Sequence, residues 1–309
     1  MISRRNIRVK VMQELYAQQA REGINDTTDP VEDLRKQLEQ CRQLFAYLLY
    51  FITEVARYAE ADAKHRASKN LPSNDDRNVS TKIAGNQLLW QILENESFKK
   101  ENKSRTIDFP DTIDQVKKIY HELLASEEYG KYIHYNGRDK KAEKDIILFI
   151  FTNLMLPNEN FIQHIEENFI NWDDDGEMMS QLMLNYLQKP GCYNLQLLIG
   201  EEKWKFAKDL LLTVTQKEEY VVELIKPRLK NWDYERIAML DMILMQMGVC
   251  EFLYFETIPP KVTINEYIDI AKEYSTNQSG HFVNGILDSI HKDLLEQNRI
   301  HKIDFKQKA

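Results

Sequence analysis

The chain has 309 residues, of which 43% are hydrophobic and 29% charged, a composition typical of globular proteins rather than disordered or membrane-spanning ones. Glycine (10) and proline (8) are scarce, which disfavours β-sandwiches, propellers and glycine-loop nucleotide folds. The formal net charge of −8 argues against non-specific binding of nucleic acid, although a local basic patch is compatible with RNA. We therefore expect an all-α protein.

The sequence predicts a cytoplasmic protein. It contains no run of about 18 apolar residues that would cross a membrane. The first ten residues are basic but lack the apolar segment of a signal peptide. Cys41, Cys192 and Cys250 are far apart and odd in number, which fits a reducing compartment.

The first twenty residues form a basic, amphipathic segment. Arg4, Arg5, Arg8 and Lys10 precede the first acidic residue, Glu14. Arg4 and Arg8 are four residues apart, so a helix places them on one face, where like charges cost a few tenths of a kcal/mol. Two interpretations stay open at this point: a solvated helix start, or an electropositive arm for phosphate.

Residues 21–200 are expected to form an enlarged helical region. Helical stretches alternate with polar loops, and no fixed-period repeat supports an α-solenoid. The run Asp173–Gly176 is acidic but lacks the alternating ligands of an EF-hand loop. We therefore expect it to be a solvated turn rather than a cation site.

Residues 201–296 show the clearest helical pattern. Thr263 and Glu266 fit a capping box, with Thr263 at the N-cap of a helix. Ser279 is predicted to cap the next helix. Gly285 lies inside that helix, where it costs about 1 kcal/mol relative to alanine, so we expect another helix to pack closely against it. The segment predicts a helical bundle.

The sequence shows few features of a catalytic site. The sequence contains no HExxH, GxSxG, Walker or GxGxxG motif. Its seven histidines do not pair with one another or with cysteine at metal-binding spacing. Cys250 falls within an apolar stripe and is expected to be a buried hydrophobic residue rather than a nucleophile. We therefore expect no enzyme activity, metal or cofactor.

The two ends of the chain carry a series of specific motifs. Together, and in this order, they resemble the NusB family over about residues 1–20 and 203–295. The segments that carry the resemblance are Ser3–Arg8 running into Gln13–Tyr16, Trp232–Ile237 with Asp241, Ile243, Leu244 and Glu251, Pro259–Glu266 with Ile270–Lys272, and Ser279 with Phe282–Asp288.

The resemblance implies an all-α transcription antitermination factor. Such proteins bind the single-stranded boxA element of nascent ribosomal RNA transcripts together with the ribosomal protein NusE, in the RNA polymerase elongation complex. The expected organisation is an N-terminal basic helix over residues 1–20, the enlarged region over 21–200, a C-terminal helical domain over 201–296 and a polar tail over 297–309.

The resemblance also implies site residues. Arg4, Arg5 and Arg8 are expected to face RNA, and the basic pattern itself adds Lys10. The family's RNA-proximal loop corresponds to Gln278, Ser279, His281 and Phe282, with a core role as the alternative for Phe282. Tyr16, whose alternative is a half-buried aromatic, and Asp241 correspond to the partner-binding surface. The chain departs from the family pattern at two positions, where Gln246 replaces an arginine and Gln278 an acidic residue.

Two other functions remain open. One is a protein-interaction scaffold without RNA binding, built on residues 21–200. The other is part of an RNA methyltransferase system, because NusB-like domains precede some ribosomal RNA cytosine methyltransferases. Those enzymes need a glycine-rich cofactor domain and a catalytic cysteine after the motif, and the sequence shows neither there.

Overall fold

The computed structural model describes residues 2–21, 29–104, 111–190, 194–229 and 236–303. Within these ranges every regular element is a helix, which confirms the all-α prediction. The chain divides into two compact units: unit 1 comprises residues 1–2 and 39–199, and unit 2 comprises residues 3–38 and 200–309. Residues 232–235 of the NusB-like motif lie outside the described ranges.

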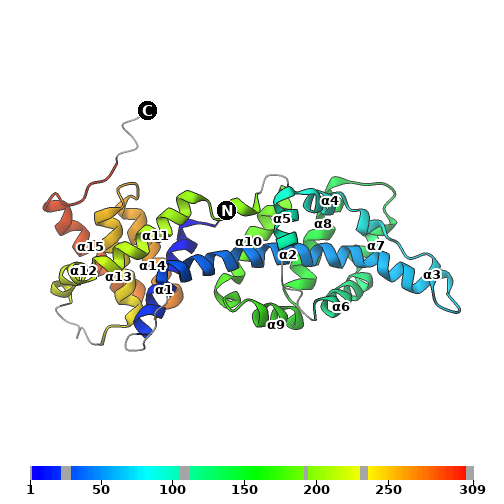
Figure 1. Cartoon of the computed structure of the whole chain (residues 1–309), viewed down its shortest axis with the longest axis horizontal. Coiled ribbons are helices and arrows are strands. Elements are labelled where there is room, and N and C mark those ends of the chain that lie inside the picture. Colours follow the sequence, from blue (N-terminus) through cyan, green and yellow to red (C-terminus); the bar gives the residue numbers. More distant parts are fainter. Residues whose placement is uncertain (1, 22–28, 105–110, 191–193, 230–235, 304–309) are drawn as a thin grey trace. The chain divides into compact units, whose positions relative to one another are not determined.

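Unit 2 is a bundle built around one buried helix, α13 (Met239–Tyr254), as Figure 1 shows. Every residue of α13 from Asp241 to Phe252 is buried. A helix that is apolar on nearly all sides must be surrounded by others, and α13 packs against five of them. These are α1 (Arg4–Ala20), α11 (Glu201–Gln216), α12 (Glu218–Ile225), α14 (Pro260–Tyr274) and α15 (Ser279–Glu296), with a short 3₁₀ turn at η5 (Lys226–Arg228).

The capping box predicted at Thr263 and Glu266 is wrong. Helix α14 begins at Pro260, because proline suits the first helical position, and Pro259 is its N-cap. Thr263 is therefore already inside the helix, and its hydroxyl donates to Glu251 Oε2 at 2.8 Å. Ser279 does not cap α15 either: Gln278 is the N-cap residue, without a side-chain cap.

The close packing predicted at Gly285 is also wrong. Gly285 is exposed, and a Cβ built there would meet nothing within 4 Å. The close approach occurs instead at Gly248 of α13, where a Cβ would lie 2.8 Å from Leu287 Cδ2 and 2.9 Å from Leu287 Cδ1. The buried glycine, rather than the exposed one, makes room for α15.

These two glycines give a matched pair of variants. We expect Gly285→Ala to stabilise the protein by about 0.5–1 kcal/mol, because alanine has the higher helix propensity and the site is open. Gly248→Ala should lose that gain or destabilise the protein, because Leu287 would have to move. Urea denaturation of both variants measures the difference, and equal shifts in stability would contradict the packing described.

Unit 1 is organised along α2 (Pro30–Ala67), whose first residues, through Leu38, belong to unit 2. In Figure 1, α2 runs the length of unit 1. The other helices of the unit are α3 (Asn74–Arg77), α4 (Gln87–Glu94), α5 (Glu96–Ser104), α6 (Thr112–Ala125), α7 (Glu127–His134), α8 (Lys140–Phe149), α9 (Glu159–Asn168) and α10 (Trp172–Gln188), with short helical turns at η1 (Lys82–Gly85), η2 (Ile150–Met155) and η4 (Leu195–Leu197).

Aromatic side chains join α2 to three neighbouring helices. Phe45 meets Tyr186 of α10 edge to face, with 5.6 Å between the ring centroids. The ring centroids of Phe51 and Phe161 of α9 are 4.7 Å apart. A third pair, Tyr58 and Tyr120, joins α2 to α6. Such pairs add about 0.5–1.5 kcal/mol each beyond the area they bury, so unit 1 has a core of its own.

The acidic run at Asp173–Gly176 is not a solvated turn. Asp173, Asp174 and Asp175 form the first turn of α10, where the helix dipole favours negative charge. Asp175 is buried, and its Oδ2 accepts a hydrogen bond from Cys41 Sγ at 3.2 Å. The prediction is therefore wrong for Asp175, which links α10 to α2.

Candidate nucleic-acid interface

The exposed basic residues of unit 2 begin at the start of α1. Ser3 is the N-cap of this helix and accepts a hydrogen bond from the Asn6 backbone N–H at 3.2 Å. The first turn contains no acidic residue to offset the helix dipole. Arg4 and Arg5 therefore add their positive charges to the positive end of a helix.

Arg4 and Arg5 each form a surface ion pair. Arg4 lies 2.7 Å from Glu202 of α11, and Arg5 lies 2.7 Å from Glu273 of α14. The arginine side chains are 42% and 34% exposed. Exposed pairs contribute only about 0–1 kcal/mol, so a phosphate can compete for either guanidinium.

Arg8 lies in the core of unit 2 rather than on its surface. Its side chain is 2% exposed and forms a two-pronged ion pair with Glu251 of α13, Nε to Oε1 at 2.7 Å and Nη2 to Oε2 at 3.1 Å. Tyr267 and Thr263 also donate to the Glu251 carboxylate, at 2.9 and 2.8 Å. Burial alone would lower the pKa of Arg8, but the hydrogen bonds and charge of Glu251 and its neighbours raise it.

The structure therefore corrects the expectation that four basic side chains line one exposed arm. The Arg8 guanidinium is paired with the Glu251 carboxylate, and Lys10 is only 1% exposed. The position along the helix explains the difference: every residue from Ile7 to Met12 is buried, which is more than one full turn, so this part of α1 is covered on all sides. The exposed basic pair is reduced to Arg4 and Arg5.

The other predicted RNA-facing residues lie at the junction of α14 and α15, with Gln278 in the connecting loop and Ser279, His281 and Phe282 in the first turn of α15. Gln278 and His281 are exposed, Phe282 is partly exposed and Ser279 is buried. The Ser279 hydroxyl donates to Asp241 Oδ2 at 2.8 Å and accepts from the Thr276 backbone N–H at 3.2 Å. Ser279 thus holds the loop in shape rather than offering a hydroxyl at the surface.

Of the two predicted partner-binding residues, one is exposed and the other is buried. Tyr16 is 47% exposed on α1, as a contact residue requires. Asp241 is 6% exposed, and its carboxylate accepts the hydrogen bond from Ser279. We therefore treat Asp241 as a residue that positions the loop.

The ion pair between Arg5 and Glu273 brings the basic end of α1 to this loop. Glu273 lies in the last turn of α14, two residues before Ser275, where the helix ends. Lys272, also in that turn, lies against Gly280, where an added Cβ would come within 2.7 Å of Lys272 Cγ. Lys272 belongs to the NusB-like motif but has no predicted role. Its contact with Gly280 places Lys272 beside the loop. This position follows from the fold and not from the sequence motif.

Gln246, which replaces the family's usual arginine, is buried in α13 with 2% exposure. It lies in the core rather than at the candidate interface. The departure at Gln278, in contrast, falls on an exposed position of the loop.

Cys250 is buried, and burial raises the pKa of its thiol to about 12, so the nucleophilic thiolate is suppressed. Among the residues that the structure describes, no cluster of three or more His, Cys, Asp or Glu side chains could hold a metal ion. None of the described helices is both long and apolar enough to span a membrane.

Comparisons with known proteins agree with the motifs. The NusB family profile matches residues 160–292. The transcription antitermination protein NusB of Salinibacter ruber is 44% identical over 97 residues, which are 31% of this chain and 61% of that protein. The protein of the same name from Finegoldia magna is 42% identical over 94 residues, 30% of this chain and 69% of that protein.

A third relative, the NusB protein of Methylacidiphilum infernorum, is 47% identical over 83 residues, or 27% of this chain and 58% of that protein. The chain therefore aligns with roughly six tenths of the length of these relatives, and the family match leaves residues 39–159 of unit 1 unmatched. The shared segment contains α13, α14 and α15, the helices that form the loop and its supporting network. The chain belongs to the NusB family.

Proposed function

We propose that the protein is a non-catalytic transcription antitermination factor that binds boxA-like single-stranded RNA of nascent ribosomal RNA transcripts together with the ribosomal protein NusE. Its relatives are named as transcription antitermination proteins. Because such a factor acts on nascent transcripts, we propose the RNA polymerase elongation complex as its partner. We propose the cytoplasm as its location. Tyr16 is proposed to contact NusE.

The ion pair between Arg5 and Glu273 is the observation that carries the proposal. It joins the Arg5 guanidinium at the start of α1 to the end of α14, next to the junction with Gln278, His281 and Phe282. Single-stranded RNA is bound by cationic surfaces with a few stacking or hydrogen-bonding side chains. Arg4 and Arg5 supply phosphate contacts, and Phe282 and His281 supply rings.

The weakness of the arginine ion pairs supports the same proposal. RNA phosphate would displace Glu202 from Arg4 and Glu273 from Arg5, and each exchange replaces one exposed charge pair with another. Two phosphate contacts alone give modest affinity with a shallow salt dependence. A partner that shares the RNA would add the missing contact area, and the net charge of −8 suits a basic ribosomal protein.

The double variant Arg4→Gln/Arg5→Gln tests the proposal. We expect the affinity for boxA-like RNA to fall about tenfold, and the slope of log K against log[salt] to decrease by about 1.4, because each phosphate contact on a single strand contributes about 0.7. Fluorescence anisotropy with labelled RNA at several salt concentrations measures both quantities.

The matched control is Lys208→Gln/Lys292→Gln, which removes the same charge from exposed positions on α11 and α15. Both variants should keep the far-UV circular dichroism spectrum of the parent protein. An Arg4/Arg5 variant that is folded and has the affinity and salt slope of the control would remove these arginines from the RNA site.

A further inference from the structure

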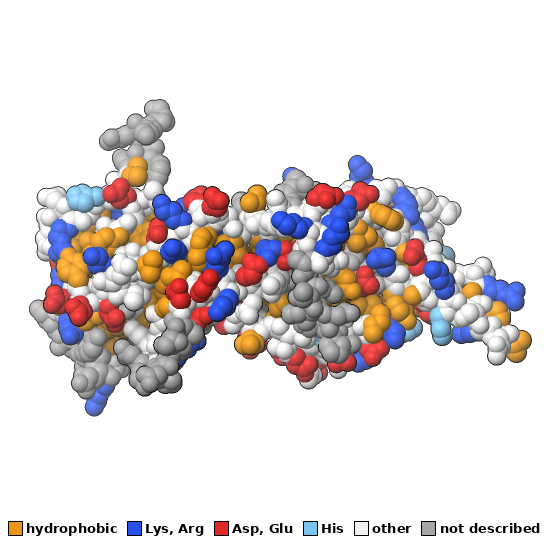
Figure 2. Space-filling view, in the orientation of Figure 1, with side chains coloured by type: hydrophobic (Ala, Val, Ile, Leu, Met, Phe, Trp, Pro, Cys, Tyr) orange, Lys and Arg blue, Asp and Glu red, His pale blue; other side chains and the backbone are white. Residues whose placement is uncertain are grey.

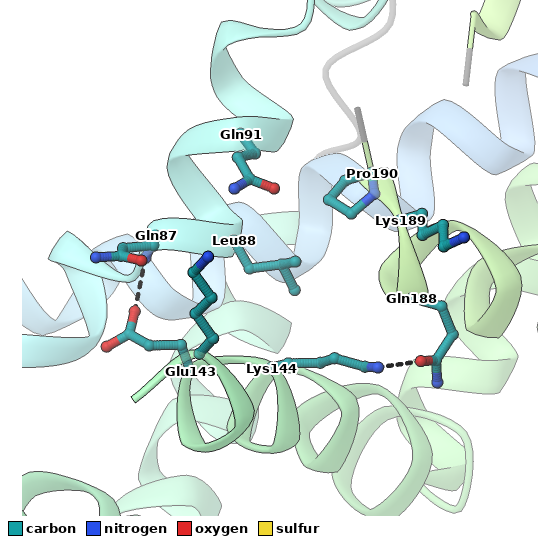
Figure 3. A pocket seen from close by; sticks show the side chains of 9 residues that line it. Gln87, Leu88, Gln91, Glu143, Lys144, Gln188, Lys189 and Pro190 are labelled. Carbon is teal, nitrogen blue, oxygen red and sulfur yellow. Dashed lines mark hydrogen bonds between the residues drawn. The ribbon is translucent and has the colours of Figure 1, made fainter. Parts of the chain in front are cut away.

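Unit 1 contains a cavity of about 280 Å³ that opens between α4, α8 and the end of α10. Figure 3 shows its walls: Leu88 and Gln91 reach down from α4, Lys144 extends across from α8, and Pro190 faces Gln91 across the opening. Its volume is near the lower end for small-molecule pockets. It suits one compact ligand or a single unit of a chain.

Positive charge dominates the lining of this cavity, which we call the lysine pocket. Lys140, Lys144 and Lys189 line it, against a single acidic residue, Glu143. The Glu143 carboxylate is already engaged: it accepts from the Gln87 backbone N–H at 2.6 Å and from the Tyr132 hydroxyl at 3.0 Å, and Arg138 lies 3.4 Å away. The lysines therefore have no free carboxylate within the pocket to neutralise them.

Helix stability does not account for the lysines on α8. Lys140 and Lys141 occupy the first two positions of this helix, where the dipole disfavours cations by a few tenths of a kcal/mol. The same dipole adds to the positive potential of Lys140 and Lys144. Figure 2 shows lysine and arginine side chains over the part of unit 1 where α4, α5 and α8 lie, although residues 39–199 contain more acidic than basic residues.

The remaining lining residues suit a nucleotide better than a simple anion. Leu88 and Pro190 are the apolar side chains of the lining; both are largely buried, and the part of each that lines the pocket can contact the face of a base. Gln87 and Gln91 are exposed amides at the rim, and an amide presents both a donor and an acceptor to a base edge. The amide oxygen of Gln188, also at the rim, accepts a hydrogen bond from Lys144 Nζ, as Figure 3 shows, so a phosphate at Lys144 would compete with this neutral partner. An acidic peptide would use the lysines but neither of these features.

We propose that the lysine pocket binds a ribonucleotide, with its phosphate at Lys140 and Lys144 and its base at Leu88 and Pro190. The nucleotide is either free or one unit of an RNA strand, because both present the same phosphate and base. The inference does not rest on the proposed boxA contact, because unit 1 contains neither Arg4 nor Arg5.

Isothermal titration calorimetry of the full-length protein tests the inference. The ligands are AMP, UMP, the corresponding nucleosides and a five-nucleotide RNA. We expect saturable binding of the nucleotides or the RNA with Kd below about 1 mM, and no binding of the nucleosides. Binding of RNA alone would assign the site to a transcript, and binding of mononucleotides would assign it to a free ligand.

The variant Lys140→Gln/Lys144→Gln should weaken this binding at least fivefold, whereas Lys118→Gln/Lys131→Gln, exposed positions on α6 and α7, should leave it unchanged. Arg4→Gln/Arg5→Gln should also leave mononucleotide binding unchanged, which separates this site from the boxA contact. Equal binding by both lysine pairs, no binding of any phosphate-bearing probe, or equally strong displacement by a polyglutamate peptide would overturn the inference.

Discussion

Replacing Arg8 with methionine is expected to destabilise unit 2 by about 3–5 kcal/mol, because the variant leaves the Glu251 carboxylate buried without its ionic partner. Glu251 is fully buried, and its remaining donors, Tyr267 and Thr263, are neutral. Arg8→Lys should recover only part of the loss, since a lysine cannot reproduce the two-pronged geometry. Urea denaturation followed by far-UV circular dichroism measures both effects.

Two further variants make this test specific. Arg8→Met/Glu251→Leu removes both charges and should regain most of the lost stability, because an apolar pair of similar volume often replaces a buried ion pair without loss. Arg5→Met removes an exposed pair and should cost less than about 1 kcal/mol. If Arg8→Met were as stable as the parent protein yet bound RNA more weakly, Arg8 would be an RNA ligand and its structural role would be refuted.

The second large effect is expected in unit 1, at the buried contact between Tyr47 of α2 and His164 of α9. The Tyr47 hydroxyl lies 2.6 Å from His164 Nε2 and 3.0 Å from Thr112 Oγ1. Tyr47→Ala should cost about 3–5 kcal/mol, because it leaves a cavity in the aromatic core. Tyr47→Phe keeps the ring and should cost about 1–3 kcal/mol, because it leaves polar partners buried without their hydroxyl.

The same contact gives unit 1 a pH dependence. Burial lowers the pKa of His164 below its usual 6.5, so at mildly acidic pH the imidazole is less protonated in the folded protein than in the unfolded chain. The unfolded state then binds more protons, and the contribution of His164 to stability falls as the pH decreases from 6.5 through the lowered pKa. Thermal denaturation between about pH 7 and pH 5 measures this loss.

His164→Gln should remove this part of the pH dependence, at the cost of a lower stability at neutral pH. His65→Gln, at an exposed position of α2, is the matched control and should leave the pH profile unchanged. An identical loss of stability on acidification in the parent protein and in His164→Gln would contradict the assignment of this dependence to His164.

The sequence predicts the elements of this fold better than their contacts. The apolar stripes and the NusB-like motifs predict the all-α bundle, because periodicity and local propensity decide which segments are helical. They do not reveal that α1 is buried on every side from Ile7 to Met12. The resemblance to the NusB family implies that Arg8 faces RNA, but its partner Glu251 is 243 residues away, and no local pattern encodes that pairing.

The same limit applies to the candidate interface. The motifs predict Asp241 and Ser279 as contact residues, and the fold joins them in a buried hydrogen bond that shapes the loop. Thr263 and Gly285 fit local rules for caps and for packing, yet tertiary contacts decide otherwise at both positions. The lysine pocket assembles side chains from three separate helices, so no local sequence pattern indicates it.

The central claim is tested most directly by the fluorescence anisotropy of a labelled boxA-like RNA titrated with the protein. The titration is made with and without the cognate NusE protein, and a scrambled RNA of equal length is the control. At two salt concentrations, we expect the protein to prefer the boxA-like RNA and to bind it more tightly when NusE is present. Equal binding of both RNAs, or no binding in either condition, would contradict an antitermination role through boxA and would favour a protein-interaction scaffold built on residues 21–200.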